Sequence, residues 1–151
     1  RTLKILKDKF DYCFYGGQGY IPILNAKFIK KKFILFNKNN KIEFTSFPVE
    51  HGQINSTAYI FKKTAYISDC NGIDFKHLKK LKKLKYLIID SLKMDKHPSH
   101  FNLQQAVYIS QLLKPKKTIL TNLHTDLDYN FLKRNLPKNI TPAFDGMKLK
   151  I

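Results

Sequence analysis

The sequence has few cysteines, few arginines and no long hydrophobic run. Cys13 and Cys70 are the only cysteines among the 151 residues, and they lie far apart with no CxxC spacing. This count supports neither a disulfide framework nor a thiolate zinc site, and two free thiols are typical of a reducing, cytoplasmic protein. No segment approaches the roughly 18 apolar residues that a membrane helix needs, so we expect no membrane partner. No signal peptide is evident near the N-terminus.

The formal net charge of +17 comes almost entirely from lysine, since Arg1 and Arg134 are the only arginines among 28 basic residues. Such a charge favours nucleic acid or another polyanion as a partner. Bidentate recognition of phosphates and bases, however, uses arginine. The lysines are spread over the whole chain, and clusters such as 30–32 and 79–83 are typical of a solvated surface. A non-catalytic basic module that binds RNA or another polyanion therefore stays open as the alternative function.

The sequence does contain a clear change of pattern, from strands to alternating helices and strands. The length predicts one domain, or part of one, with a sizeable core. Runs rich in Ile, Phe, Tyr and Thr predict strands, and helical spacing of apolar residues predicts helices. The predicted strands are 22–29, 33–36, 41–48, 56–61, 64–68, 85–90, 117–121 and 147–151, and the predicted helices are 2–10, 74–83, 102–113 and 128–135. This order predicts a mixed α/β fold with a partly parallel sheet.

Two polar segments interrupt this pattern early in the chain. The GGQG segment at 16–19 matches neither GxGxxG nor GxxxxGK[ST], so we interpret it as a turn and not as a phosphate-binding loop. The Asn-Lys-Asn-Asn segment at 37–40 predicts a turn between two strands.

Polar residues that could perform chemistry gather where predicted strands end and helices begin. His51 follows a strand in PVEHG, Asp69 ends one in AYISDC, His124 follows KTILT, and His97 and His100 precede the strongest predicted helix. In α/β sheets such loops are where sites are built. Imidazoles and carboxylates suit zinc, manganese or iron. Taken singly, each is also an ordinary surface histidine or turn aspartate, so spacing alone leaves the question open.

Five motifs follow one another along the chain: PVEHG, AYISDC, IIDSLKMDKHPSHFNLQQAV, LTNLHTDLDYNFLKRNLP and PAFDGMKL. Their order resembles hydrolases of the metallo-β-lactamase fold, and among them those similar to the cyclic-phosphate phosphodiesterase of phosphonate breakdown. The resemblance runs from about Lys4 to Ile151. It implies an αββα sandwich, of which residues 1–151 cover the C-terminal half of a single domain. It also implies a metal-dependent phosphodiesterase acting on a small phosphodiester or cyclic phosphate.

The same resemblance implies metal ligands. His51 would bind one ion, Asp69 would bridge two, and His124 would supply a third ligand. Many relatives place this last histidine directly after Leu-Thr, where the chain has Asn122, and His124 is the nearest imidazole. The implied cofactors are two divalent ions, Zn²⁺ or Mn²⁺, which activate water as hydroxide.

Catalytic roles are implied for two further histidines. His100 would protonate the leaving oxygen, and His97 would lie beside it in the wall of the pocket. Asp90 would orient a neighbouring ligand.

One signature of the fold, His-x-His-x-Asp-His, occurs nowhere in the sequence. In relatives it lies in the N-terminal half, and the chain begins with Arg1 instead of Met. We therefore expect that the remaining metal ligands come from a missing N-terminal half or from a homo-oligomer. By itself, the fragment is expected to bind metal weakly and to be inactive.

Overall fold

The computed structural model of the protein describes residues 2–37 and 40–151. The chain separates into two compact units, Arg1–Lys30 and Lys31–Ile151. The turn predicted at 37–40 falls largely on Lys38 and Asn39, which lie outside the described residues.

The N-terminal unit contains two short helices, α1 (Thr2–Lys9) and α2 (Asp11–Tyr15). The first confirms the predicted helix. The second ends at Gly16, whose φ of 67° favours glycine. The predicted turn in GGQG is confirmed, because Gly17 and Tyr20 exchange backbone hydrogen bonds of 3.1 and 2.9 Å.

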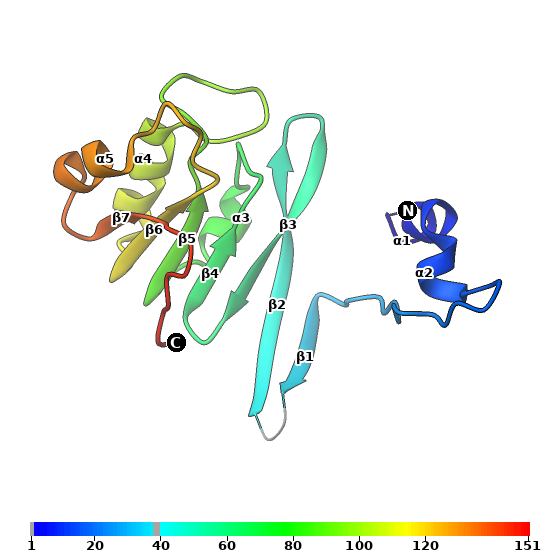
Figure 1. Ribbon diagram of the computed structural model, residues 1–151. Coiled ribbons are helices and arrows are strands. Elements are labelled where there is room, and N and C mark those ends of the chain that lie inside the picture. Colours follow the sequence, from blue (N-terminus) through cyan, green and yellow to red (C-terminus); the bar gives the residue numbers. More distant parts are fainter. Residues whose placement is uncertain (1, 38–39) are drawn as a thin grey trace. The chain divides into compact units, whose positions relative to one another are not determined.

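The C-terminal unit is built on one seven-stranded sheet in which the strands lie side by side in chain order (Figure 1). The first four strands pair antiparallel, and the last four pair parallel. The strands are β1 (Lys32–Asn37), β2 (Asn40–His51), β3 (Ile54–Phe61), β4 (Thr64–Ile67), β5 (Tyr86–Asp90), β6 (Lys117–Thr121) and β7 (Ile140–Pro142). The predicted mixed α/β fold with a partly parallel sheet is thus confirmed, and the C-terminal ends of β4, β5 and β6 meet at one edge.

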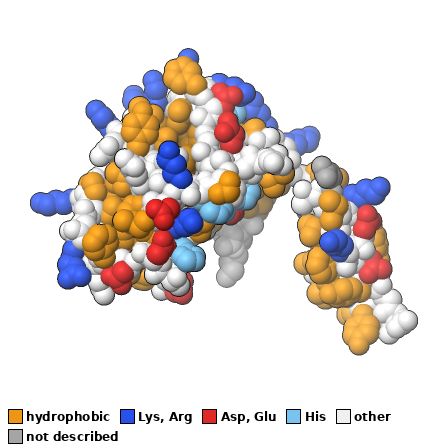
Figure 2. All heavy atoms as spheres, turned by 90° about the horizontal axis from the view of Figure 1, so that it is seen from above, with side chains coloured by type: hydrophobic (Ala, Val, Ile, Leu, Met, Phe, Trp, Pro, Cys, Tyr) orange, Lys and Arg blue, Asp and Glu red, His pale blue; other side chains and the backbone are white. Residues whose placement is uncertain are grey.

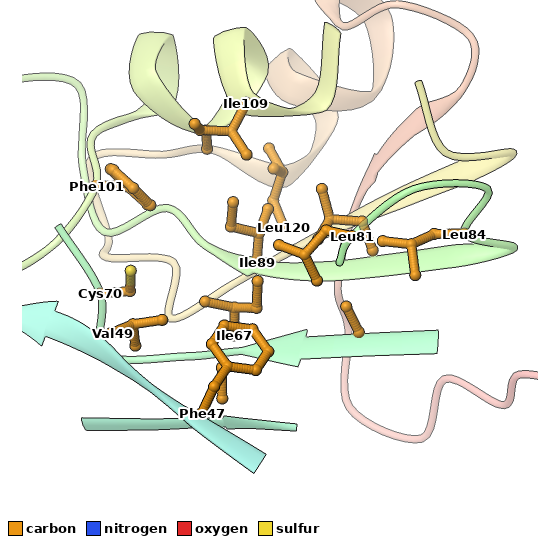
Figure 3. Close-up of a cluster of buried hydrophobic side chains, with 14 of the residues drawn as sticks. Phe47, Val49, Ile67, Cys70, Leu81, Leu84, Ile89, Phe101, Ile109 and Leu120 are labelled. Atoms are coloured by element: carbon orange, nitrogen blue, oxygen red, sulfur yellow. The ribbon is translucent and has the colours of Figure 1, made fainter. Parts of the chain in front are cut away.

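One face of this sheet carries the hydrophobic core. Ile67, Ile89 and Leu120 are register partners on β4, β5 and β6, so their side chains point to the same face of the sheet. Each of them is at most 2% exposed. Figure 3 shows these side chains beneath helix α4 (Leu103–Leu113), from which Ile109 points toward the sheet. This core fixes the strand ends that carry the polar residues.

Three helices accompany the strands: α3 (Phe75–Leu78), α4 and α5 (Tyr129–Asn135). Asn102 caps α4 by accepting a hydrogen bond from the Gln105 amide, while the Gln105 side chain accepts one from the Asn102 amide. Helices α4 and α5 confirm the predicted positions, whereas α3 is shorter than the predicted helix 74–83. Among the described residues, no helix is long and apolar enough to cross a membrane.

Two predicted strands were wrong. Residues 22–29 form no strand, because Pro22 lacks a backbone donor and the amides of Ile23 and Leu24 both bond to the Cys13 carbonyl, at 3.0 and 2.9 Å. Residues 147–151 form no strand either, and the last strand is the three-residue β7, which contains Pro142. Ile140, the first residue of β7, packs in the core.

Candidate metal centre

Four strands place polar residues at the same edge of the sheet. His51 ends β2, Asp90 ends β5, Asn122 directly follows β6, and Asp69 lies two residues beyond β4. Figure 2 looks onto this edge from above and shows histidine side chains beside acidic ones. Asp69 and Asn122 have φ values of 52° and 61°. Asp and Asn tolerate this left-handed region better than most residues do, and such backbone strain clusters at functional sites.

The structure brings His51, Asp69 and His100 together. Each offers one ligand atom, and these atoms all lie within 4.8 Å of one another. They come from residues up to 49 positions apart in a chain of 151. Two imidazole nitrogens and a carboxylate oxygen are a donor set that suits a zinc or manganese ion.

The two histidines of this group are oriented through their Nδ1 atoms. His51 Nδ1 lies 2.8 Å from the Ser99 carbonyl oxygen, and His100 Nδ1 lies 2.6 Å from Asp90 Oδ2. Because these oxygens only accept, both Nδ1 atoms donate, and each ring keeps a lone pair on Nε2. An outer partner that fixes the tautomer in this way is typical of histidines that bind metals.

Asp90 is the buried anchor of His100. Its side chain is fully buried and the His100 side chain is 17% exposed. Asp90 Oδ2 also accepts a 2.8 Å hydrogen bond from the Cys70 amide. Burial raises the pKa of Asp90, while the Cys70 amide and the His100 ring act against that rise. Burial also raises the pKa of the Cys70 thiol to about 12, so Cys70 offers no thiolate ligand at neutral pH.

His97 has the opposite tautomer. Its Nδ1 accepts a 3.3 Å hydrogen bond from the Ser99 amide, so the proton of the neutral ring lies on Nε2. The His97 and His100 rings lie 5.1 Å apart between centroids. Burial and the nearby His100 ring lower the pKa of His97. This ring therefore offers a hydrogen-bond donor beside the group of His51, Asp69 and His100.

Asn71 anchors the loop that carries His97 and His100, and no motif in the sequence pointed to this residue. Its Oδ1 accepts a 3.0 Å hydrogen bond from the Gly52 amide, and its Nδ2 donates at 2.8 Å to the Pro98 carbonyl. Gly52 has a φ of 61°, and a Cβ there would lie 3.2 Å from that of Ser99. The tip of the β2–β3 hairpin and the loop of His100 thus pack closely.

His124 lies outside this group. Its Nδ1 donates to Asp126 Oδ1 at 2.9 Å, and its side chain is 59% exposed. Its backbone amide bonds to the Leu92 carbonyl at 2.8 Å. From the same loop, Asn122 instead faces the group, with Nδ2 3.4 Å from Asp69 Oδ1. A metal-binding role for His124 stays a prediction.

The mixed sheet, its helices and the donor set at the strand ends have the architecture of the metallo-β-lactamase fold. The chain belongs to the beta-lactamase superfamily domain family, which matches residues 1–122. The predicted fold family is thereby confirmed.

Solved structures agree on the fold. A diphosphatase from the PhnP family superposes with a TM-score of 0.84 and 30% identity over 98% of this chain and 54% of its own. The YhfI protein of Bacillus subtilis, of the metallo-β-lactamase fold, superposes with a TM-score of 0.60 and 14% identity over 79% of this chain and 53% of its own. The short form of human tRNase Z superposes with a TM-score of 0.55 and 21% identity over 78% of this chain and 46% of its own. The last two likenesses show the fold alone.

One curated relative also matches, an octanoyltransferase of Porphyromonas gingivalis. It is 28% identical over 103 residues, which are 66% of this chain and 21% of that protein. The chain thus spans a fifth of this relative and about half of the solved diphosphatase.

Proposed function

We propose that the chain forms one wall of the active site of a metal-dependent phosphodiesterase. The observation that carries the proposal is the convergence of His51, Asp69 and His100, whose ligand atoms lie within 4.8 Å of one another. Both histidines have Nδ1 occupied and Nε2 free. A chance cluster on the surface would not require both imidazole rings to be oriented by hydrogen bonds.

His51 and Asp69 would hold the divalent ions, with Asp69 shared between two. Both residues fit this role, because their donor atoms are the types that Zn²⁺ and Mn²⁺ accept. Bound divalent ions supply an activated water and neutralise charge on the phosphoryl group. The remaining ligands would come from an N-terminal half of the fold or from a second copy of the chain.

His100 would act as the acid. With Nδ1 donating to Asp90, Nε2 of the protonated ring would carry the proton that passes to the departing oxygen of the diester. The buried Asp90 carboxylate fixes the orientation of the ring. His97 would donate from Nε2 to a substrate oxygen nearby.

Charge and kinship support the proposed substrate class. A protein with a net charge of +17 attracts anionic ligands. The relative with 30% identity is a diphosphatase, an enzyme that cleaves a phosphorus–oxygen bond. We propose a small phosphodiester or cyclic phosphate.

The test is hydrolysis of bis(p-nitrophenyl) phosphate with added Mn²⁺ or Zn²⁺, by the protein in which this chain is joined to an N-terminal half. His51→Ala should abolish metal binding and turnover. His100→Ala should retain metal and lose most of the turnover. A joined protein that binds no metal, yet binds RNA with a steep salt dependence, would instead support the basic binding module.

A further inference from the structure

The carboxylate of Asp69 is held from both sides by neutral donors. Ser68 Oγ donates to Oδ2 at 3.2 Å, and Asn122 Nδ2 donates to Oδ1 at 3.4 Å. The backbone is anchored as well, since Ser56 Oγ donates to the Asp69 carbonyl at 2.7 Å. A carboxylate has about four lone-pair sites. One donor on each oxygen therefore leaves both oxygens able to bind a cation.

Asn122 and Asp69 follow strands that are not adjacent in the sheet, because β5 lies between β4 and β6. Asn122 directly follows β6, and 53 residues separate it from Asp69. Its φ of 61° is a left-handed conformation that Asn adopts more easily than most residues. The NH₂ group of Asn122 thus contacts the Asp69 carboxylate from beyond the intervening strand β5.

The loop after β6 contains one imidazole, and it points elsewhere. His124 Nδ1 bonds to Asp126, whose Oδ2 also accepts from the Met94 amide at 3.4 Å. Turning His124 toward Asp69 would break this arrangement. Asn122 is the residue of this loop that contacts a member of the group of His51, Asp69 and His100.

We infer that Asn122 is a positioning residue of the metal centre: its side-chain amide donates a hydrogen bond to the Asp69 carboxylate and so orients it. His124, by the same inference, is no metal ligand. The inference rests on the proposed function, because it presupposes that Asp69 binds an ion. Outer partners of a ligating carboxylate typically contribute 10–100-fold to metal affinity. A neutral amide performs this task without adding charge to the site.

The experiment is a titration of the 151-residue chain with Co²⁺, followed by its visible absorption spectrum. Asn122→Gly removes the amide while retaining the left-handed backbone, and should weaken Co²⁺ binding about 10–100-fold. His124→Ala should change the affinity less than twofold. Lys114→Gly is the matched backbone control, since Lys114 also has a positive φ, of 48°, at the end of α4. Ser68→Ala should weaken binding in the same direction as Asn122→Gly.

The melting temperature of the metal-free protein distinguishes a loss of metal positioning from a loss of stability. The inference expects this temperature to be the same in Asn122→Gly and Lys114→Gly. Unchanged Co²⁺ affinity in Asn122→Gly, or a large loss in His124→Ala, would overturn the inference while leaving the proposed function intact. A wild-type chain that binds no Co²⁺ even at millimolar concentration would overturn the inference, whereas the proposed function stands or falls with metal binding and hydrolysis by the joined protein.

Discussion

Asp90 Oδ2 accepts a 2.6 Å hydrogen bond from His100 Nδ1, with the carboxylate fully buried at the end of β5. The same side chain receives the Cys70 amide, so the residue after Asp69 and the ring of His100 are held by one carboxylate. The chain contains a second histidine–aspartate pair, His124 and Asp126, whose side chains are 59% and 41% exposed. The two pairs share their chemistry and differ in burial, which makes them matched partners for mutagenesis.

Asp90→Asn should lower kcat of the joined protein about 10–100-fold with little change in KM, because the ring of His100 loses the partner that fixes its tautomer. Asp126→Asn should change kcat less than twofold, since an exposed pair contributes little. Steady-state hydrolysis of bis(p-nitrophenyl) phosphate measures both, and metal content is determined for each variant. Equal effects of the two substitutions would contradict the assignment.

Strong periodicity made much of the fold predictable from the sequence. The strand at 117–121 and the helix at 102–113 were predicted to within a residue, because a short apolar run and an Asn cap are local signals. The segment 22–29 looked equally apolar, but whether it forms a strand depends on a neighbour with free backbone groups. That information is not local, which is why the prediction was wrong there.

The candidate site was predictable in its chemistry and not in its contacts. His51, Asp69 and His100 could be singled out because each lies where a strand ends or a helix begins. Asn71 could not, since it acts across 19 residues and an Asn in a loop is common. Asn122 was noted only as the residue that stands where relatives have a histidine, and its contact with Asp69, 53 residues away, could not be predicted. The direction of His124 depends on its bond to Asp126, which sequence spacing does not reveal.

Ile89→Ala should lower the free energy of unfolding by about 2–5 kcal/mol, because it leaves a cavity in a fully buried part of the core. Ile54→Ala is the control, since Ile54 is 66% exposed at the start of β3. Urea unfolding of the metal-free chain, followed by circular dichroism, measures both. A loss below 1 kcal/mol for Ile89→Ala would mean that this strand is not packed as described.

His77 should make stability depend on pH. Burial against Phe47, with Lys80 and Lys76 nearby, lowers the pKa of His77 below its ordinary value of 6.5. Well above pH 6.5 the ring is neutral in both the folded and the unfolded chain, so it does not change the free energy of unfolding with pH. As the pH falls from 6.5 toward the lowered pKa of the folded state, the unfolded chain binds the proton more readily, so stability decreases.

The measurement is urea unfolding of the metal-free chain at pH 7.5, 6.5 and 5.5. His77→Phe keeps the aromatic contact and should flatten this part of the pH profile, whereas His124→Gln, at an exposed position, should leave the slope unchanged. An identical slope in His77→Phe would assign the pH dependence to other groups. Asp74 and Lys31 also act on His77 and are present in all three proteins.

The sheet face opposite the core should drive self-association of the isolated chain. Tyr59, Tyr66 and Ile88 are register partners on β3, β4 and β5, so they form one apolar row, and Tyr66 is 38% exposed. An apolar row of this kind marks an interaction surface. Tyr66→Lys should therefore lower the weight-average mass in sedimentation at high protein concentration. Tyr108→Lys, which places the same charge at a 62% exposed position on α4, should not. If both variants sediment like the wild type, residues outside this row hold the copies together, and the row is not the surface through which the chain associates.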